Sequence, residues 1–156
     1  MLDIKTILVV AFAVYILMGL VSFFARYKNF RSGSNYWGTA MLILALGTFL
    51  IALRNMIPDY ASIVIGNAVV MIGLSFFTLA ICEYAERPLP YKPLGVILVL
   101  YIIFFHLFTG ENYFKLRVVV YSFTSVLIHS ITVYFLFKIE GRKWVNEIYF
   151  LILFFS

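Results

Sequence analysis

The sequence predicts an all-α fold, a polytopic helical membrane bundle. Of the 156 residues, 64% are hydrophobic and only 12% are charged, whereas a soluble domain carries about 25% charged and 45–50% apolar residues. The mean hydropathy is +1.03. The charged residues cluster between uncharged apolar runs, and most of these runs are long enough to cross a hydrocarbon core of about 30 Å. A bilayer is therefore the expected solvent of this fold.

Five apolar runs are expected to form full transmembrane helices, within one membrane-embedded domain that covers residues 1–156. The expected spans are approximately 4–24, 37–57, 62–82, 94–109 and 118–137, followed by an incomplete sixth at 145–156. That last run amounts to roughly 18 Å of helix, too short for the hydrocarbon core. Because a chain terminus buried there would place a carboxylate in hydrocarbon, we expect this sequence to be the front part of a longer protein.

The first run is expected to be a retained helix and not a cleaved signal peptide. A signal peptide would place its positive charges before a shorter apolar region, whereas here Arg26, Lys28 and Arg31 follow the run. Tyr36-Trp37 opens the second run, and such aromatic pairs are typical of the headgroup boundary.

A tight turn joins the second and third runs. Pro58 lacks an N–H and disfavours helix at the residue before it, so the second helix is expected to end near Ile57. The two helices must then lie antiparallel and in contact. Small side chains let a neighbouring backbone approach closely, and we expect four of them to mediate helix packing, namely Gly47, Ser62, Gly66 and Gly73.

The later boundaries are marked by breakers and charges. Pro88, Pro90 and Pro93 are expected to separate the third and fourth runs, and Thr109-Gly110 to end the fourth. Eight basic residues follow runs one, three and five, and four lie at the opposite ends of the runs. By the positive-inside rule the richer side is cytoplasmic, which places the amino terminus outside.

Composition and motifs exclude several function classes. The formal net charge is +5. The basic residues that give this charge lie in short turns between apolar runs, where lipid headgroups are the nearest anions, so we expect no nucleic-acid partner. There is no Walker-type loop, no HExxH and no plausible catalytic triad, so we expect no enzyme activity in this chain. His106 and His129 are expected to differ in depth by roughly 12 Å, which excludes a shared metal atom, and no metal or cofactor is expected.

Five polar residues are expected near the external ends of the runs. They are Arg54, Asn67, His106, Glu111 and Arg117. In a bundle they could converge on a cavity open to the outside, where two guanidiniums would suit an anionic ligand. The alternative is that Arg54 and Arg117 extend to lipid headgroups while Asn67 and His106 bond between helices.

Several segments together resemble the multi-pass amino-terminal membrane region of bacterial GGDEF proteins, the diguanylate cyclases. They are Met1-Leu2-Asp3-Ile4-Lys5-Thr6, Tyr36-Trp37-Gly38, Ala45-Leu46-Gly47, Ala52-Leu53-Arg54, Ile57-Pro58-Asp59, Ser62-Ile63-Val64-Ile65-Gly66-Asn67 and Leu116-Arg117-Val118-Val119. The resemblance implies a sensory or anchoring module in the bacterial inner membrane, ahead of a cytoplasmic domain that makes cyclic di-GMP from GTP.

The same resemblance implies a homodimer, because cyclase domains work in pairs, and a small-molecule or membrane-derived signal as the partner besides the lipid bilayer. The catalytic domain itself is absent from these residues. The alternative function is a small membrane transporter or a transporter subunit. Transporters typically show internal repeats with interrupted helices, and no convincing repeat is present here.

Overall fold

The computed structural model describes residues 4–27 and 34–137, and within these ranges it is helical with no β-strand. The all-α prediction is therefore confirmed. The elements in chain order are α1 (Ile4–Tyr27), α2 (Ser34–Ala52), the π-helical turn η1 (Tyr60–Ile65), α3 (Gly66–Tyr84), α4 (Tyr91–Leu107), the 3₁₀ turn η2 (Glu111–Tyr113) and α5 (Phe114–Phe137).

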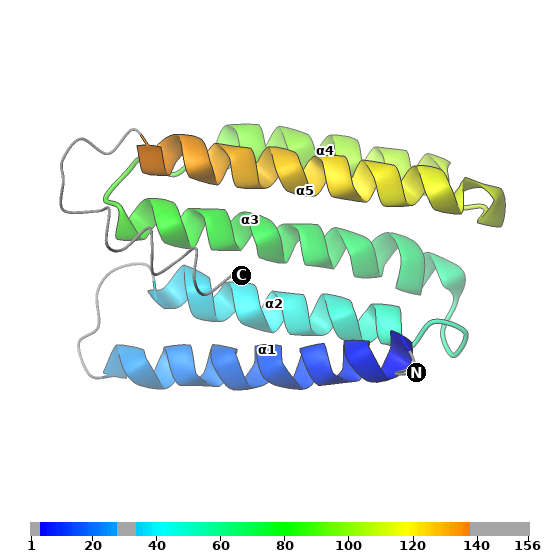
Figure 1. The fold of residues 1–156 in the computed structure, drawn as a ribbon, viewed down its shortest axis with the longest axis horizontal. Helices are drawn as coiled ribbons and strands as arrows, with labels where there is room; N and C mark the ends of the chain where they lie inside the picture. The colour runs from blue at the N-terminus through cyan, green and yellow to red at the C-terminus, as the bar shows by residue number, and fades with distance from the viewer. Residues whose placement is uncertain (1–3, 28–33, 138–156) are drawn as a thin grey trace.

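The helices run alternately up and down the long axis of the bundle (Figure 1). Helix α1 packs on α2, and α2 packs on α3, which also contacts α4 and α5. Among the described elements α1 contacts α2 alone, whereas α3 contacts every long helix except α1. Helix α3 is therefore the central element, and α1 lies at one edge of the bundle.

Four helical segments are long and apolar enough to cross a membrane. They are Lys5–Phe24, Asn35–Ala52, Tyr60–Tyr84 and Phe114–Phe135. Helix α4 is also apolar but has only 17 residues, or about 26 Å, slightly less than a typical hydrocarbon core. The structure thus gives four candidate spans where the sequence predicts five full ones, and the predicted sixth at 145–156 lies outside the described residues.

Several helix boundaries differ from the predicted spans, and α5, for example, begins at Phe114 and not at 118. Helix α2 ends at Ala52 and not near Ile57, because Asn55 adopts a left-handed conformation with φ 74°, which Asn tolerates better than most residues. Helix α4 already begins at Tyr91, so Pro93 lies within its first turn. A proline is tolerated there because the first N–H groups of a helix have no partner within the helix.

Glycines allow α2 and α3 to approach closely. A Cβ atom added to Gly47 would lie 2.6 Å from Val70 Cγ2 and 2.8 Å from the Val70 backbone nitrogen. A Cβ atom on Gly73 would lie 2.8 Å from Leu44 Cγ, and one on Gly66 would lie 3.0 Å from Ile51 Cγ1. All of these glycines therefore lie where the two helices meet.

A polar contact joins α3 to α5. The hydroxyl oxygens of Thr78 and Thr132 are 2.8 Å apart, and both residues are buried. The Thr78 hydroxyl also lies 3.3 Å from the Leu74 carbonyl oxygen, and the Thr132 hydroxyl lies 3.2 Å from that of Ile128. One hydroxyl can therefore donate to its own helix while the other donates across the helix pair. Around this pair, buried apolar residues of α3, α4 and α5 form the main core, including Met71, Phe105 and Ile128.

Candidate functional site

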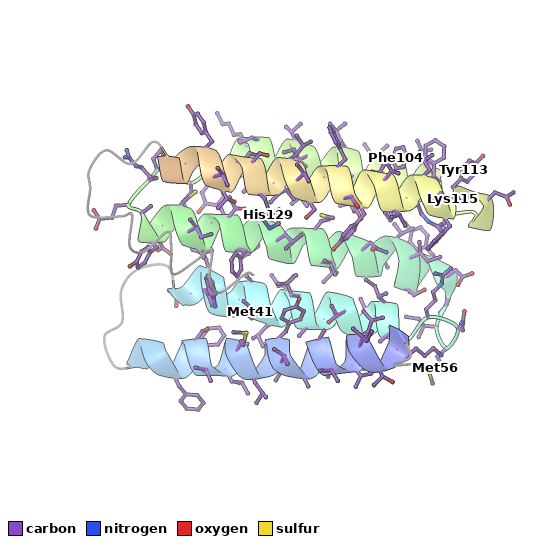
Figure 2. The ribbon with its side chains drawn as sticks, in the orientation of Figure 1. Met41, Met56, Phe104, Tyr113, Lys115 and His129 are labelled. Atoms are coloured by element: carbon purple, nitrogen blue, oxygen red, sulfur yellow. The ribbon has the colours of Figure 1, made fainter. Side chains whose placement is uncertain are left out.

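The predicted polar residues all belong to one end of the bundle, which we call the hairpin end. It consists of the α2–η1 turn (53–59) and the α4–α5 connection (108–113), which lie at the same end of the bundle in Figure 1, with the start of α3 between them. Figure 2 shows Met56 in the first segment and Lys115 just after the second. Arg54 lies in the turn, Asn67 in the first turn of α3, His106 in the last turn of α4, Glu111 in η2 and Arg117 in the first turn of α5.

Arg117 points inward and binds the end of α4. Its side chain is only 5% exposed. The Nη1 group donates hydrogen bonds to the carbonyl oxygens of Phe108 at 3.3 Å and Gly110 at 3.2 Å, and also to that of Thr109. The last carbonyls of a helix have no partner within the helix, and a cation there is favoured by the helix dipole. Arg117 therefore satisfies the end of α4 and ties it to α5.

Thr109 completes the same helix end. Its hydroxyl donates to the carbonyl oxygens of Phe105 at 3.1 Å and His106 at 2.8 Å. The Phe108 ring contacts the Tyr113 ring edge-on, with their centroids 5.1 Å apart. The connection between α4 and α5 is thus held by both hydrogen bonds and aromatic packing.

His106 connects α4 to η1. Its imidazole is exposed and meets the ring of Tyr60 edge-on, with centroids 5.8 Å apart. Tyr60 opens η1, so this contact places the end of α4 against the start of the segment that leads into the central helix.

The π-helical turn η1 is a feature that the sequence does not reveal. In it, the Gly66 N–H donates to the carbonyl of Ala61, five residues earlier, so the turn is wider than that of an α-helix. Asn67 Nδ2 donates to the Ile63 carbonyl at 2.7 Å, which adds a side-chain donor to this wide turn. Asn67 is therefore bonded to its own helix and not to a neighbouring one.

Arg54 differs from Arg117 because its guanidinium is not bonded to the carbonyls of a helix end. Its side chain is half-buried, and within the described residues its guanidinium makes no hydrogen bond or ion pair. Both Arg54 and Asp59 lie within electrostatic range of Arg117. Among the described side chains, the hairpin end therefore holds two guanidiniums and the Asp59 carboxylate, with the Arg54 group available to a further anion. The side chain of Glu111 lies outside the described residues.

The two histidines do not share a site. His106 lies at the hairpin end, whereas His129 lines a groove on α5 together with Ser125 and Tyr134. Within the described part of the chain, no group of three or more His, Cys, Asp or Glu side chains could hold a metal ion.

Sequence reasoning missed two polar features elsewhere. At the opposite end of the bundle, the hydroxyls of Tyr36 and Tyr91 lie 2.8 Å apart and join α2 to α4. In the core, the hydroxyl of Tyr101 is buried and has no hydrogen-bond partner in the described residues. No sequence signal marks either one, since tyrosine is common in these helices and its partners depend on packing.

The fold and the site define an apolar, all-helical bundle with a polar, arginine-containing end, compatible with a location in a membrane. No protein-family model matches the chain, and no curated protein or solved structure matches it.

Proposed function

We propose that this chain is the membrane sensory and anchoring module of a signal-transduction protein, and that an anionic group binds at its hairpin end. The output domain that the sequence resemblance implies is a cytoplasmic diguanylate cyclase. In this proposal the membrane is the bacterial inner membrane, with the hairpin end outside.

The observation that carries the proposal is the state of Arg54. Its side chain is half-buried, and its guanidinium makes no hydrogen bond within the described residues. The guanidinium of the nearby Arg117, by contrast, donates to the carbonyl oxygens at the end of α4. A planar guanidinium suits a carboxylate or phosphate, to which it donates two parallel hydrogen bonds. Of the two guanidiniums at this end, Arg54 is therefore the one that makes no hydrogen bond within the described residues and can bind an anion.

The position of η1 supplies a route for the signal. Arg54 lies in the turn that leads into η1, and η1 contacts α2, α3 and α4. π-Helical turns are frequent at functional sites. An anion that draws Arg54 toward it would pull on this turn and so on α3, whose other end lies beside the start of α4 (Figure 1). Helix α3 would then transmit movement across the bundle.

The first test is to read the coding DNA beyond Ser156 and, where the frame continues, to express the full-length product. We expect the DNA to encode a GGDEF-type domain. We also expect membranes that contain the full-length product to convert GTP to cyclic di-GMP. Arg54→Ala should abolish the response to the signal at unchanged membrane abundance, and Asn67→Ala should do the same because it loosens the wide turn. Arg54→Lys should retain part of the response, since it keeps the charge but loses the bidentate geometry.

Lys115→Ala is the matched control, because it removes an exposed cation from the same end and should leave the response intact. The signalling proposal would be contradicted if the full-length product had no output domain and moved a solute into proteoliposomes. That result would favour the transporter alternative. Equal responses of wild type, Arg54→Ala and Asn67→Ala would contradict the proposed binding site.

A further inference from the structure

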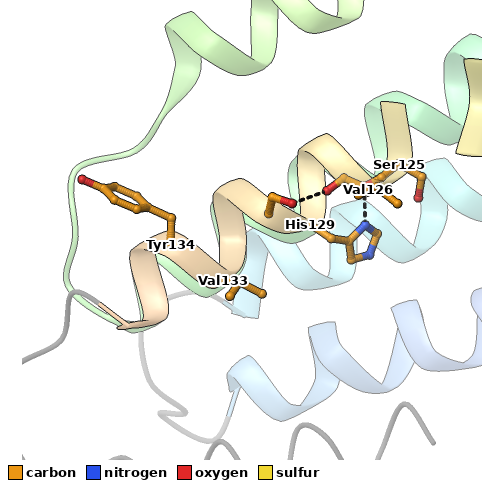
Figure 3. A pocket seen from close by; sticks show the side chains of 6 residues that line it. Ser125, Val126, His129, Val133 and Tyr134 are labelled. Carbon is orange, nitrogen blue, oxygen red and sulfur yellow. Dashed lines mark hydrogen bonds between the residues drawn. The ribbon is translucent and has the colours of Figure 1, made fainter. Parts of the chain in front are cut away.

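A carboxylate oxygen without a partner lies at the end of the bundle opposite the hairpin end. Glu83 belongs to the last turn of α3, its side chain is half-buried, and its Oε2 atom is buried with no hydrogen-bond partner in the described residues. The groove on α5 differs, because its His129 Nδ1 atom lies 2.7 Å from the Ser125 carbonyl oxygen (Figure 3). Burying a charge without a partner is unfavourable, and the carbonyl end of a helix favours cations. The Glu83 carboxylate therefore lies where a positive group would be stabilised.

Two tyrosine hydroxyls lie near this carboxylate. The hydroxyl oxygens of Tyr36 in α2 and Tyr91 in α4 are 2.8 Å apart, and Glu83 lies within electrostatic range of Tyr91. One hydroxyl donates to the other, and both oxygens can still accept hydrogen bonds. The Tyr36 ring also meets the ring of Phe76 in α3, with centroids 6.0 Å apart. This corner of the bundle thus combines a carboxylate, two hydroxyls and aromatic rings from three helices.

Oxygen acceptors beside aromatic rings suit a primary ammonium group. An ammonium has three N–H donors and no acceptor, and the face of an aromatic ring attracts it electrostatically. A divalent metal ion fits less well, because no group of three or more His, Cys, Asp or Glu side chains in the described part of the chain could hold one. The chemistry of this corner therefore favours an organic ammonium over a metal ion.

The same corner lies at the end of two candidate membrane spans. Glu83 is the penultimate residue of the span Tyr60–Tyr84, and Tyr36 lies near the first residue of the span that α2 forms. In a bilayer both residues would lie at the headgroup boundary, where tyrosines are typical. Lys92 is exposed in the first turn of α4 and adds a cation that suits a lipid phosphate.

We propose that Glu83, Tyr36 and Tyr91 bind the primary ammonium group of an aminophospholipid headgroup. The carboxylate and the tyrosine oxygens accept its N–H groups, and Lys92 contacts the adjoining phosphate. The inference rests on the membrane location in the proposed function but not on the anion site, which lies at the opposite end of the bundle (Figure 1). A soluble amine, or a lysine of this chain, could supply the same ammonium chemistry, so the test separates these sources.

Lipid binding to the full chain in detergent is measured by native mass spectrometry and by thermal unfolding with added lipid. We expect phosphatidylethanolamine to bind about tenfold more tightly than phosphatidylcholine, the effect of one hydrogen bond to a charged group. Phosphatidylcholine is the matched lipid, because its headgroup keeps the positive charge and the phosphate but has no N–H. Glycerophosphoethanolamine, which has the same headgroup without acyl chains, should not displace the bound lipid at equal concentration.

Glu83→Gln should abolish the preference for phosphatidylethanolamine, because a neutral amide attracts an ammonium weakly. Glu86→Gln is the matched control, since it removes an exposed carboxylate three residues away and should keep the preference. Tyr36→Phe and Tyr91→Phe should each reduce the preference about three- to fivefold, as expected for a hydrogen bond between less strongly charged groups. The ratio of two lipid affinities within one variant does not depend on the overall stability of that variant.

Equal binding of the two lipids by wild type would overturn the proposal, and so would a preference that survives Glu83→Gln. Displacement of the bound lipid by glycerophosphoethanolamine at equal concentration would assign the site to a soluble amine instead. An equal loss of stability of Glu83→Gln with either lipid would show that the cation comes from this chain, and the lipid assignment would then also be wrong. These readouts need no signal and no output domain, so a failure here leaves the proposed signalling role and the Arg54 site to their own tests.

Discussion

Arg117→Leu is expected to lower the stability of the bundle by about 1.5–3 kcal/mol, the usual contribution of a hydrogen bond to a charged group. The substitution keeps an apolar stem but leaves the carbonyls of Phe108 and Gly110 without their donor. The connection 108–113 should then become sensitive to protease while α1 and α2 stay protected. Unfolding in mixed micelles and limited proteolysis of the purified protein measure the two effects.

Two further variants make the Arg117 result interpretable. Arg117→Lys should recover part of the lost stability, because an ammonium still donates to carbonyls but lacks the reach of the guanidinium. Lys115→Leu removes an exposed cation two residues away and should change stability little. If Arg117→Leu and Lys115→Leu behave alike, Arg117 does not hold the end of α4.

Gly47→Ala is expected to lower stability by about 1–3 kcal/mol through overpacking between α2 and α3. The new Cβ atom would lie 2.6 Å from Val70 Cγ2 and 2.8 Å from the Val70 nitrogen. A side chain can rotate away, but a backbone nitrogen moves only with its helix, so the two helices must separate. The midpoint of thermal aggregation in detergent is the measurement.

Gly95→Ala is the control for Gly47→Ala. It is the same substitution within a helix, but a Cβ atom there meets nothing within 4 Å. Alanine favours helix over glycine by roughly 0.5–1 kcal/mol, so this variant should be as stable as wild type or slightly more stable. Equal losses for Gly47→Ala and Gly95→Ala would contradict close α2–α3 packing.

Much of the fold could be predicted from the sequence because apolar runs and breakers set the helices. The early end of α2 could not, since it depends on the left-handed conformation of Asn55, one of several conformations open to Asn in a turn. The π turn over Tyr60–Ile65 has no sequence marker, because its residues would form an ordinary α-helix equally well. Only the packing of the turn against α2 and α4 distinguishes the two.

The candidate site shows a similar division. Alternating helices bring the ends of runs two to five to one side, so the sequence alone places Arg54 and Arg117 at the same end. It does not say which guanidinium points inward. That choice depends on three-dimensional contacts, because Arg117 follows a connection whose carbonyls turn toward it, whereas Arg54 has no such group within reach in the described residues.

Cysteine accessibility most directly tests the proposal that this chain crosses a membrane with the hairpin end outside. In the Cys82→Ala background, Met56→Cys lies in the hairpin turn, where the native side chain is 77% exposed. Lys92→Cys lies in the first turn of α4, and this helix begins at the opposite end of the bundle (Figure 1). With a membrane-impermeant thiol reagent on spheroplasts, we expect Met56→Cys to be labelled and Lys92→Cys to be labelled only after lysis. Labelling of Lys92→Cys alone, or of both positions in intact spheroplasts, would contradict the claim.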